Sequence, residues 1–279
     1  MLKNSFCHIP EFGCKMEEQL SSRGVLSWKE AILASELPLS LSRRETLQEH
    51  LMCSTEELSK NNATYFSEAL PAGCIWRLFP EFRKDTAFID IETTGLDGPG
   101  DYITTIAVFD GHKIQHYVYG QNLTDFKHDI GRFKVIVTYN GSIFDLPFIR
   151  SRLEVPMDQT HIDLRQLLAS LDITGGLKKC EAELGIGRGV MTGINGLFTM
   201  GLWLDYSRGN DRALETLLAY NVLDSVHLET LMVRAYNLKI RQTPFAKCNR
   251  LSEAEPFVNI PFTPHIPTIE RLKRRYSLG

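Results

Sequence analysis

The spacing of apolar and polar residues divides the chain into three zones. Residues 1–80 place apolar side chains at helical spacing between short polar breaks, which predicts a small helical accessory region. Residues 81–240 change to short β-branched and aromatic runs, followed by further helical segments. Residues 241–279 form a proline-rich and basic C-terminal tail. The helices predicted in the first zone are Met16–Leu20, Trp28–Ser35, Arg43–Leu51 and Thr55–Lys60.

The second zone predicts an α/β domain. A hairpin signal, Asp110-Gly111, separates two of its predicted strands. The longest helical segment spans about Asp211 to Leu238. Strands that come first, followed by mixed strands and helices, predict one mixed β-sheet flanked by helices. The predicted strands are Ala87–Ile91, Tyr102–Val108, Ile114–Tyr119, Val135–Tyr139 and Thr160–Ile162.

The tail and the charge balance say little about function. The prolines of the tail predict an extended or disordered segment, and its basic cluster is interpreted as a solvated charge run. The formal net charge of −3 does not by itself indicate nucleic-acid binding, because phosphate contacts usually come with a basic surface. The tail residues concerned are Pro244, Pro256, Pro261, Pro264 and Pro267, then Arg271, Lys273, Arg274 and Arg275.

Cysteine usage and hydropathy predict a cytoplasmic protein. The cysteines are scattered, and their spacing matches neither a zinc site nor a disulfide scaffold, so reduced thiols are expected. The first residues lack the apolar core of a signal peptide, and no uncharged apolar run is long enough to cross a bilayer. We therefore expect a soluble protein with no membrane partner.

The first candidate site residues lie in the run Phe88–Gly95. Residues two apart in a strand share a face, so Asp90 and Glu92 point the same way. Their apolar neighbours predict a central strand, in which two adjacent carboxylates repel each other and lose hydration. Hard divalent cations such as Mg²⁺ would compensate this cost. The alternative is an exposed pair of acids at a strand end beside the Gly95 turn.

The second candidate group follows the strand predicted at Val135–Tyr139. Asn140-Gly141 ends this strand and a helix should follow, which places Asp145 in the first helical turn at the mouth of the sheet. Ser142-x-x-Asp145 is also a capping-box pattern. A purely structural role for Asp145 is therefore an open alternative.

The third group lies on the long helix. One stripe at helical spacing is apolar except for Asp224, and Tyr220 lies four residues earlier on the same face. A buried tyrosine in such a stripe usually only packs. A lone aspartate there is harder to explain without a binding role. The stripe consists of Ala213, Leu217, Tyr220, Asp224, Leu228, Leu231 and Ala235.

Taken together, the three groups resemble a known family. Asp90 to Gly95 resembles the first motif of the DEDD (DnaQ-like) exonucleases, which belong to the RNase H-like superfamily. Asn140 to Asp145 resembles their second motif, and Tyr220-x-x-x-Asp224 resembles the third in its tyrosine-bearing variant. The stretch from Thr86 to Leu238 is most similar to the YprB-type branch. Two intervening segments support this similarity, His161–Leu164 and Leu202–Tyr206.

The resemblance implies a metal-dependent 3′–5′ exonuclease that hydrolyses phosphodiester bonds at single-stranded or frayed ends of DNA or RNA. Two divalent ions, Mg²⁺ or Mn²⁺, would clamp the scissile phosphate roughly 3.5–4 Å apart. By this resemblance, Asp90, Glu92 and Asp224 hold the ion on the nucleophile side. Asp90 also serves the second ion, together with Asp145 directly or through water.

The same resemblance assigns roles to residues around the acids. Tyr220 would orient the attacking water, since a phenol with an ordinary pKa near 10 is a poor general base at neutral pH. The backbone of Thr93 and Thr94, together with Asn140, would meet the terminal nucleotide.

Other residues have weaker functional signals. Asp163 follows a predicted strand and is interpreted as a structural acid rather than an additional ligand, and His227 as a surface or core residue. His8 to Gly13 resembles the hairpin of helix-hairpin-helix modules, in which glycine usually stands where this chain has Glu11. A helical lid packed on the nuclease domain is the alternative for the N-terminal region.

Two other functions remain compatible with the sequence. One is a non-catalytic nucleic-acid-binding scaffold that kept the fold, although idle carboxylates would still repel one another. The other is a structure-specific endonuclease that uses the same metal site. Digestion of linear and circular single strands would separate the exonuclease from the endonuclease.

Overall fold

A five-stranded mixed sheet forms the centre of the molecule, with strand order β3-β2-β1-β4-β5. The computed structural model describes residues 1–34, 37–253 and 259–276. Strands β1, β2 and β3 pair antiparallel, whereas β4 and β5 continue the sheet parallel to β1. The mixed sheet expected from the sequence is therefore confirmed. The strands are β1 Thr86–Thr93, β2 Ile103–Phe109, β3 Ile114–Val118, β4 Val135–Thr138 and β5 Thr160–Asp163.

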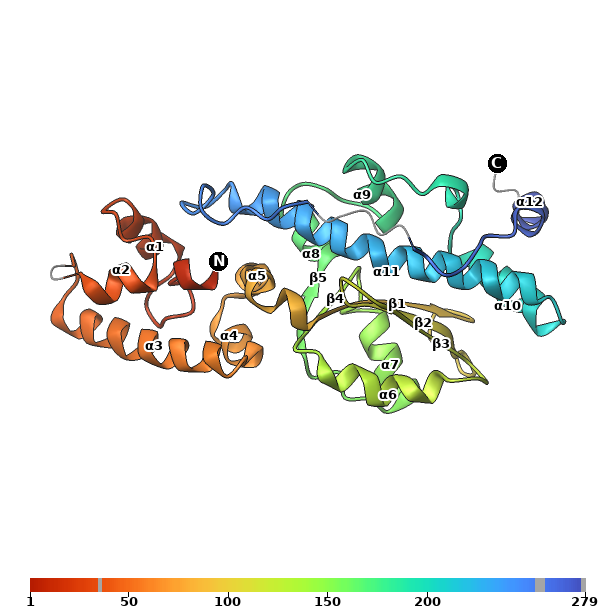
Figure 1. Ribbon diagram of the computed structural model, residues 1–279, viewed down its shortest axis with the longest axis horizontal. Coiled ribbons are helices and arrows are strands. Elements are labelled where there is room, and N and C mark those ends of the chain that lie inside the picture. Colours follow the sequence, from red (N-terminus) through yellow and green to blue (C-terminus); the bar gives the residue numbers. More distant parts are fainter. Residues whose placement is uncertain (35–36, 254–258, 277–279) are drawn as a thin grey trace.

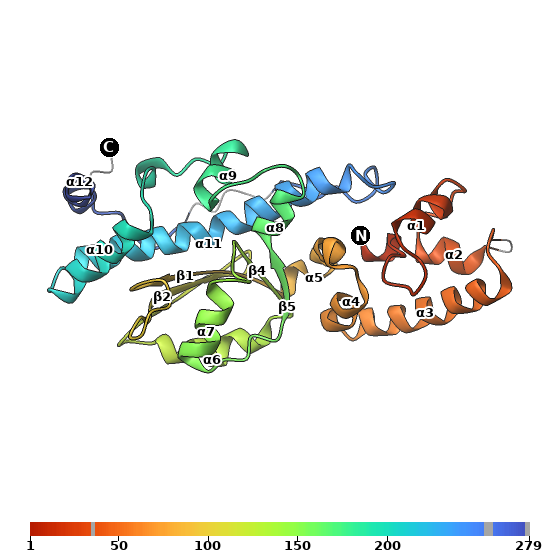
Figure 2. The same cartoon turned by 180° about the vertical axis from the view of Figure 1, so that it is seen from behind.

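Helices cover both faces of this sheet (Figure 1). The long helix α11 runs along one face, with α8, α9 and α10 on its side, and α6 and α7 lie beneath the opposite face (Figures 1 and 2). Alternation along β1 explains the layers: Ile89 belongs to the core shared with α7, and Phe88 to the core shared with α11. These helices are α6 Phe126–Asp129, α7 Asp145–Leu153, α8 Leu164–Ala169, α9 Leu177–Glu183, α10 Gly196–Ser207 and α11 Asp211–Ile240.

Helix α11 is buried along most of its length, including every residue of the predicted stripe. It contains neither glycine nor proline, and Asp211 in its first turn favours the helix N-terminus. Asp90 and Glu92 point from β1 toward this helix, because they alternate with Ile89 and Ile91, which pack against the other helical layer. The pairing of a central strand with a buried helix is what positions the site.

The N-terminal helices lie at the β5 end of the sheet, opposite α10 and α12 (Figures 1 and 2). The Met1 ammonium pairs with Glu81, and Thr160 of β5 donates a hydrogen bond to Ser67. Helix α3 is continuous where two helices were expected, because no glycine or proline interrupts it. The elements are α1 Cys14–Ser21, α2 Trp28–Leu33, α3 Leu41–Ser59, α4 Ala63–Ala69, a 3₁₀ helix at Ala72–Leu78 and α5 Phe79–Phe82.

The hairpin near the N-terminus keeps the backbone shape that glycine usually provides. Glu11 has a φ of 66°, in the left-handed region, and its carboxylate pairs with Arg43. His8 is buried and shares a hydrogen bond of 2.9 Å with Ser54. This hairpin is thus part of the packed helical region.

The C-terminal segment is more ordered than expected. Helix α12 spans Ile266–Arg275 and buries Ile269 and Leu272 in the cluster formed with α10 and α11. Pro267 stands in its first turn, where a missing N–H costs little, so proline there begins a helix instead of preventing one. Arg271, expected to be solvated, pairs with Asp205. Ser35 and Pro256 lie outside the described residues. Within the part of the chain that the structure describes, no helix has both the length and the apolar character needed to span a membrane.

Candidate active site

Three carboxylates that are far apart in the sequence converge between β1 and α11. Asp90 and Glu92 project from β1, and Asp224 projects from α11 to meet them. One oxygen of each carboxylate lies within 4.8 Å of the other two. Asp224 is only 2% exposed, whereas Asp90 and Glu92 are partly open to solvent. The structure thus brings together three of the four predicted acids.

Asp145 borders this group without joining it. It opens α7, is 5% exposed, and its negative charge raises the pKa of both Asp90 and Glu92. The expected capping box does not form: the Ser142 hydroxyl donates to Asp163 at 2.5 Å, and no side chain caps α7. The Ser142–Asp145 capping box, on which the purely structural alternative for Asp145 was based, is therefore absent.

Burial and mutual repulsion raise the pKa values of these acids. Burial raises the pKa of Asp90 most, followed by the charges of Asp224 and Glu92. Burial and then Asp224 raise the pKa of Glu92 to about 7, and burial raises the pKa of Asp145 to about 7. Backbone hydrogen bonds, including one from Ile91, offset part of the rise at Asp145. A proton or a cation is needed to stabilise such a cluster.

The donor set fits a hard divalent cation. Mg²⁺ binds oxygen at about 2.0–2.1 Å in an octahedron, so ligand oxygens lie about 3 to 4 Å apart. The oxygens of Asp90, Glu92 and Asp224, all within 4.8 Å of one another, need only small movements to reach that spacing. Carboxylate oxygens are also the ligands that such ions prefer.

Tyr220 lies beside the acids on α11. Its side chain is buried, and the ammonium of Lys178 and the guanidinium of Arg188 lie 4.6 and 5.2 Å from its ring centroid. Burial, followed by the charges of Asp224 and Glu92, raises the pKa of Tyr220. The phenol therefore stays protonated at neutral pH and can donate a hydrogen bond.

The two cations over Tyr220 were not identified from the sequence. Lys178 and Arg188 both form ion pairs with Asp224, and Arg188 also contacts the two oxygens of Glu181 at 2.7 and 2.8 Å. One signal for Lys178 was available: it stands in the first turn of α9, where the helix dipole disfavours a cation. The sequence around Arg188 carries no comparable signal.

Two neutral side chains orient the strand carboxylates and were also missed. The Asn221 amide donates to the Asp90 carbonyl at 3.0 Å and to its carboxylate at 2.7 Å. The Thr199 hydroxyl donates to Glu92 at 2.7 Å. Asn221 directly follows Tyr220, but a polar residue inside a buried helix does not reveal its partner in the sequence.

Comparisons with known proteins agree with this architecture. A family model of the RNase H superfamily matches residues 87–236, more than half of the chain. The chain belongs to the RNase H superfamily. The match begins in β1 and ends in α11, so it includes all four acids and Tyr220.

Two further comparisons add little to the RNase H superfamily assignment. Among solved structures, the family B DNA polymerase from the hyperthermophilic archaeon Pyrobaculum calidifontis shares 17% identity at a TM-score of 0.39. The similarity covers 54% of this chain and 27% of the polymerase, so it supports no conclusion about activity. No curated protein matches the chain.

The predicted nucleotide contacts of this RNase H superfamily domain are engaged within the protein. The Thr93 hydroxyl donates to the Gly95 carbonyl at 2.6 Å. The Thr94 backbone N–H donates to the carbonyl of Tyr102 at 3.0 Å. Asn140 has a φ of 66°, and its side-chain oxygen accepts a hydrogen bond of 2.6 Å from Arg165. These contacts shape the loops around the acids.

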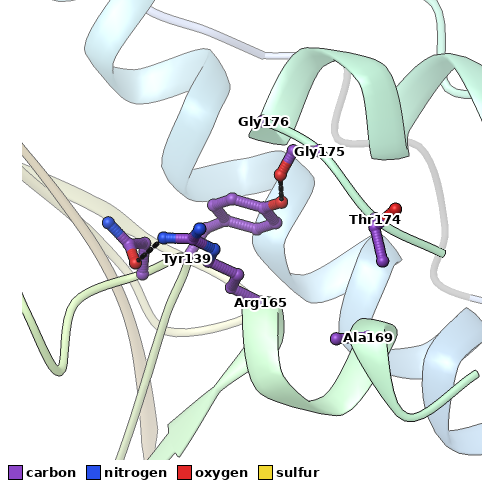
Figure 3. Close-up of a pocket in the computed structure, with 7 residues that line it drawn as sticks. Tyr139, Arg165, Ala169, Thr174, Gly175 and Gly176 are labelled. Atoms are coloured by element: carbon purple, nitrogen blue, oxygen red, sulfur yellow. Dashed lines mark hydrogen bonds between the residues drawn. The ribbon is translucent and has the colours of Figure 1, made fainter. Parts of the chain in front are cut away.

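A pocket of about 550 Å³ adjoins Asn140 at the ends of β4 and β5. Figure 3 shows Tyr139 directed toward Gly175, whose carbonyl accepts a hydrogen bond from the Tyr139 hydroxyl. The Gly175-Gly176 turn, which lines this pocket, leads into α9, which carries Lys178. The lining residues are Tyr139, Asn140, Arg165, Ala169, Thr174, Gly175 and Gly176.

The remaining candidates have structural partners. Asp163 accepts hydrogen bonds from the backbone N–H groups of Asn140 and Arg165 at 2.8 and 3.0 Å, in agreement with a structural acid. His227 shares a hydrogen bond of 2.9 Å with Glu181, a partner that the sequence did not reveal.

Proposed function

We propose that this chain is a metal-dependent 3′–5′ exonuclease of the tyrosine-bearing DEDD type, most similar to the YprB-type branch. Its substrate is a single-stranded or frayed end of DNA or RNA. Membership of the RNase H superfamily favours a nuclease. The observation that carries the proposal is the convergence of Asp90, Glu92 and Asp224 next to Tyr220.

The four acids are the proposed ligands of two divalent cations, Mg²⁺ or Mn²⁺. Asp90, Glu92 and Asp224 would hold one ion, and Asp90 with Asp145 would hold the other. Bound ions of this kind lower the pKa of water and neutralise charge on a phosphate. Asn221 and Thr199 support the proposal, because their hydrogen bonds fix the orientation of the Asp90 and Glu92 carboxylates.

Tyr220 is the proposed positioning group for the attacking water. Its protonated hydroxyl can donate to that water but cannot remove its proton, so it orients the water without serving as the base. Lys178 and Arg188 extend positive charge over the same site. Lys178, which is partly exposed, is suited to contact the nonbridging oxygens of the scissile phosphate.

The terminal nucleotide is proposed to lie between the backbone of Thr93 and Thr94 and the pocket beside Asn140. That pocket combines an aromatic ring, Tyr139, with the guanidinium of Arg165. An aromatic face stacks on a base, and a guanidinium binds phosphate, so both would recognise a nucleotide. The proposed division into a 1–80 accessory region, an 81–240 nuclease domain and a 241–279 tail assigns the substrate to the middle part.

The proposal is tested by digestion of end-labelled DNA and RNA with Mg²⁺ or Mn²⁺. We expect the wild-type chain to shorten linear single strands from the 3′ end and to leave circular single strands intact. Asp90→Ala should lose metal-dependent degradation because it removes a shared ligand. The exposed Asp158→Ala is the matched control and should retain it. Equal rates for Asp90→Ala and wild type would exclude this mechanism, and cleaved circles would indicate an endonuclease.

A further inference from the structure

Three cysteine thiols converge in the N-terminal helical region, away from the carboxylates. Cys7 precedes the hairpin, Cys14 opens α1, and Cys74 lies in the 3₁₀ helix Ala72–Leu78. Their sulfur atoms all lie within 4.8 Å of one another, and those of Cys7 and Cys14 are 3.4 Å apart. This cluster was not predicted from the sequence, because its members do not have the short spacing of known zinc motifs.

A buried ion pair between Arg77 and Glu17 lies beside the cysteine cluster. Arg77 contacts both oxygens of Glu17 at 2.7 and 2.9 Å, and its Nη1 lies 3.5 Å from the Cys7 sulfur. Glu17 also accepts hydrogen bonds from the Ser5 hydroxyl and the Phe6 N–H. The Cys7 thiol also donates to Glu17 at 3.3 Å, so this ion pair fixes the position of the Cys7 sulfur beside the other two thiols.

The spacing of the sulfurs suits one tetrahedral metal ion. A zinc–sulfur bond of about 2.3 Å places neighbouring sulfurs of a tetrahedron about 3.8 Å apart. The three sulfurs therefore need only small adjustments around a common centre. A disulfide between Cys7 and Cys14 would join two of them and would not include Cys74, whereas a metal ion can bind all three.

A cavity gives access to the cluster. It has a volume of about 270 Å³, and Cys14, Cys74 and Arg77 form part of its lining. Cys14 is exposed, whereas Cys7 and Cys74 are only 5% and 8% exposed. An ion can thus enter beside Cys14 and reach the two buried sulfurs, with room for water as the fourth ligand.

We propose that Cys7, Cys14 and Cys74 form a site for one thiophilic divalent cation of the Zn²⁺ class. The ion would tie the N-terminal hairpin to α1 and to the 3₁₀ helix that leads into the nuclease domain. Its role is structural, because it joins segments that are distant in the sequence. The site is independent of the proposed nuclease activity.

The test uses the full-length reduced protein and two probes, Zn²⁺ and Co²⁺. Wild type should retain about one Zn²⁺ per chain on elemental analysis and develop a thiolate-to-cobalt charge-transfer band with Co²⁺. Cys14→Ser should weaken zinc binding more than about tenfold and lose most of the band. Because Cys14 is exposed, serine there leaves the packing intact. Cys53→Ser, at another exposed cysteine on α3, is the matched control and should behave as wild type.

Further measurements separate this site from the carboxylates and from oxidation. Asp90→Ala should keep the cobalt band, since the band reports sulfur ligands. A zinc chelator should lower the melting temperature of wild type but not that of Cys14→Ser. A reduced wild-type protein without bound zinc and without the cobalt band would overturn the proposal. So would a Cys7–Cys14 disulfide in the isolated protein whose reduced form binds no zinc.

Discussion

At the scale of single residues, Asp224 pairs with two cationic side chains that differ in their exposure to solvent. Arg188 is 6% exposed and held by Glu181, whereas Lys178 is 33% exposed and contacts Asp224 from a flexible side chain. The charge of Lys178 also offsets part of the rise in the pKa values of Asp90 and Glu92. A divalent ion and Lys178 therefore compete for the same negative charge. We expect Lys178, and not the anchored Arg188, to release Asp224 when metal binds.

Replacing Lys178 should separate metal binding from turnover. Lys178→Met removes the competing charge, so Mg²⁺ or Mn²⁺ should bind about tenfold more tightly in the absence of nucleic acid, as measured by titration calorimetry. The catalytic rate at saturating metal should fall, because a cation facing the phosphate is lost. Lys179→Met, which changes the exposed next residue, should alter neither quantity. Weaker metal binding by Lys178→Met would contradict the competition.

At the scale of elements, the sequence predicted the strands and helices whose apolar residues recur with a strong periodicity. All five strands and α11 were expected within a few residues of their observed bounds, because alternation and helical stripes are local signals. The same alternation placed Asp90 and Glu92 on one face. Lys178 and Arg188 could not be assigned, because their pairing with Asp224 depends on how α9 and the loop after it pack on α11.

The attachment of α9 to α11 depends on a buried charge network. Glu181 is fully buried and contacts Arg188 and His227. Arg188→Met should destabilise the protein by about 3–5 kcal/mol, because it leaves a buried carboxylate without its main partner. The double variant Glu181→Gln with Arg188→Met should recover part of that loss, since the unpaired charge is then removed. Urea unfolding of wild type, Glu181→Gln, Arg188→Met and the double variant measures this coupling, and strictly additive losses would show that the pair is not coupled.

At the scale of the whole molecule, each of the two candidate metal sites brings together segments that are distant in the sequence. The carboxylates link β1 to α11, and the thiols link the hairpin to the 3₁₀ helix before the RNase H superfamily domain. Hard ions such as Mg²⁺ prefer oxygen ligands, and softer ions prefer thiolates. The two sites should therefore respond to different metals.

The response of global stability to Mg²⁺ or Mn²⁺ follows from the crowded carboxylates. Ions that bind only the folded chain stabilise it by mass action, by about 2.7 kcal/mol at a hundredfold excess over the dissociation constant. The melting temperature should therefore rise by several degrees with either ion and fall back on chelation. Asp145→Asn should reduce this rise because it removes negative charge beside Asp90 and Glu92. Asp158→Asn, at an exposed position, should leave the rise unchanged. If the melting temperature of Asp145→Asn rises as much as that of wild type, Asp145 does not belong to the proposed metal site. Asp90, Glu92 and Asp224 would then be the remaining ligands.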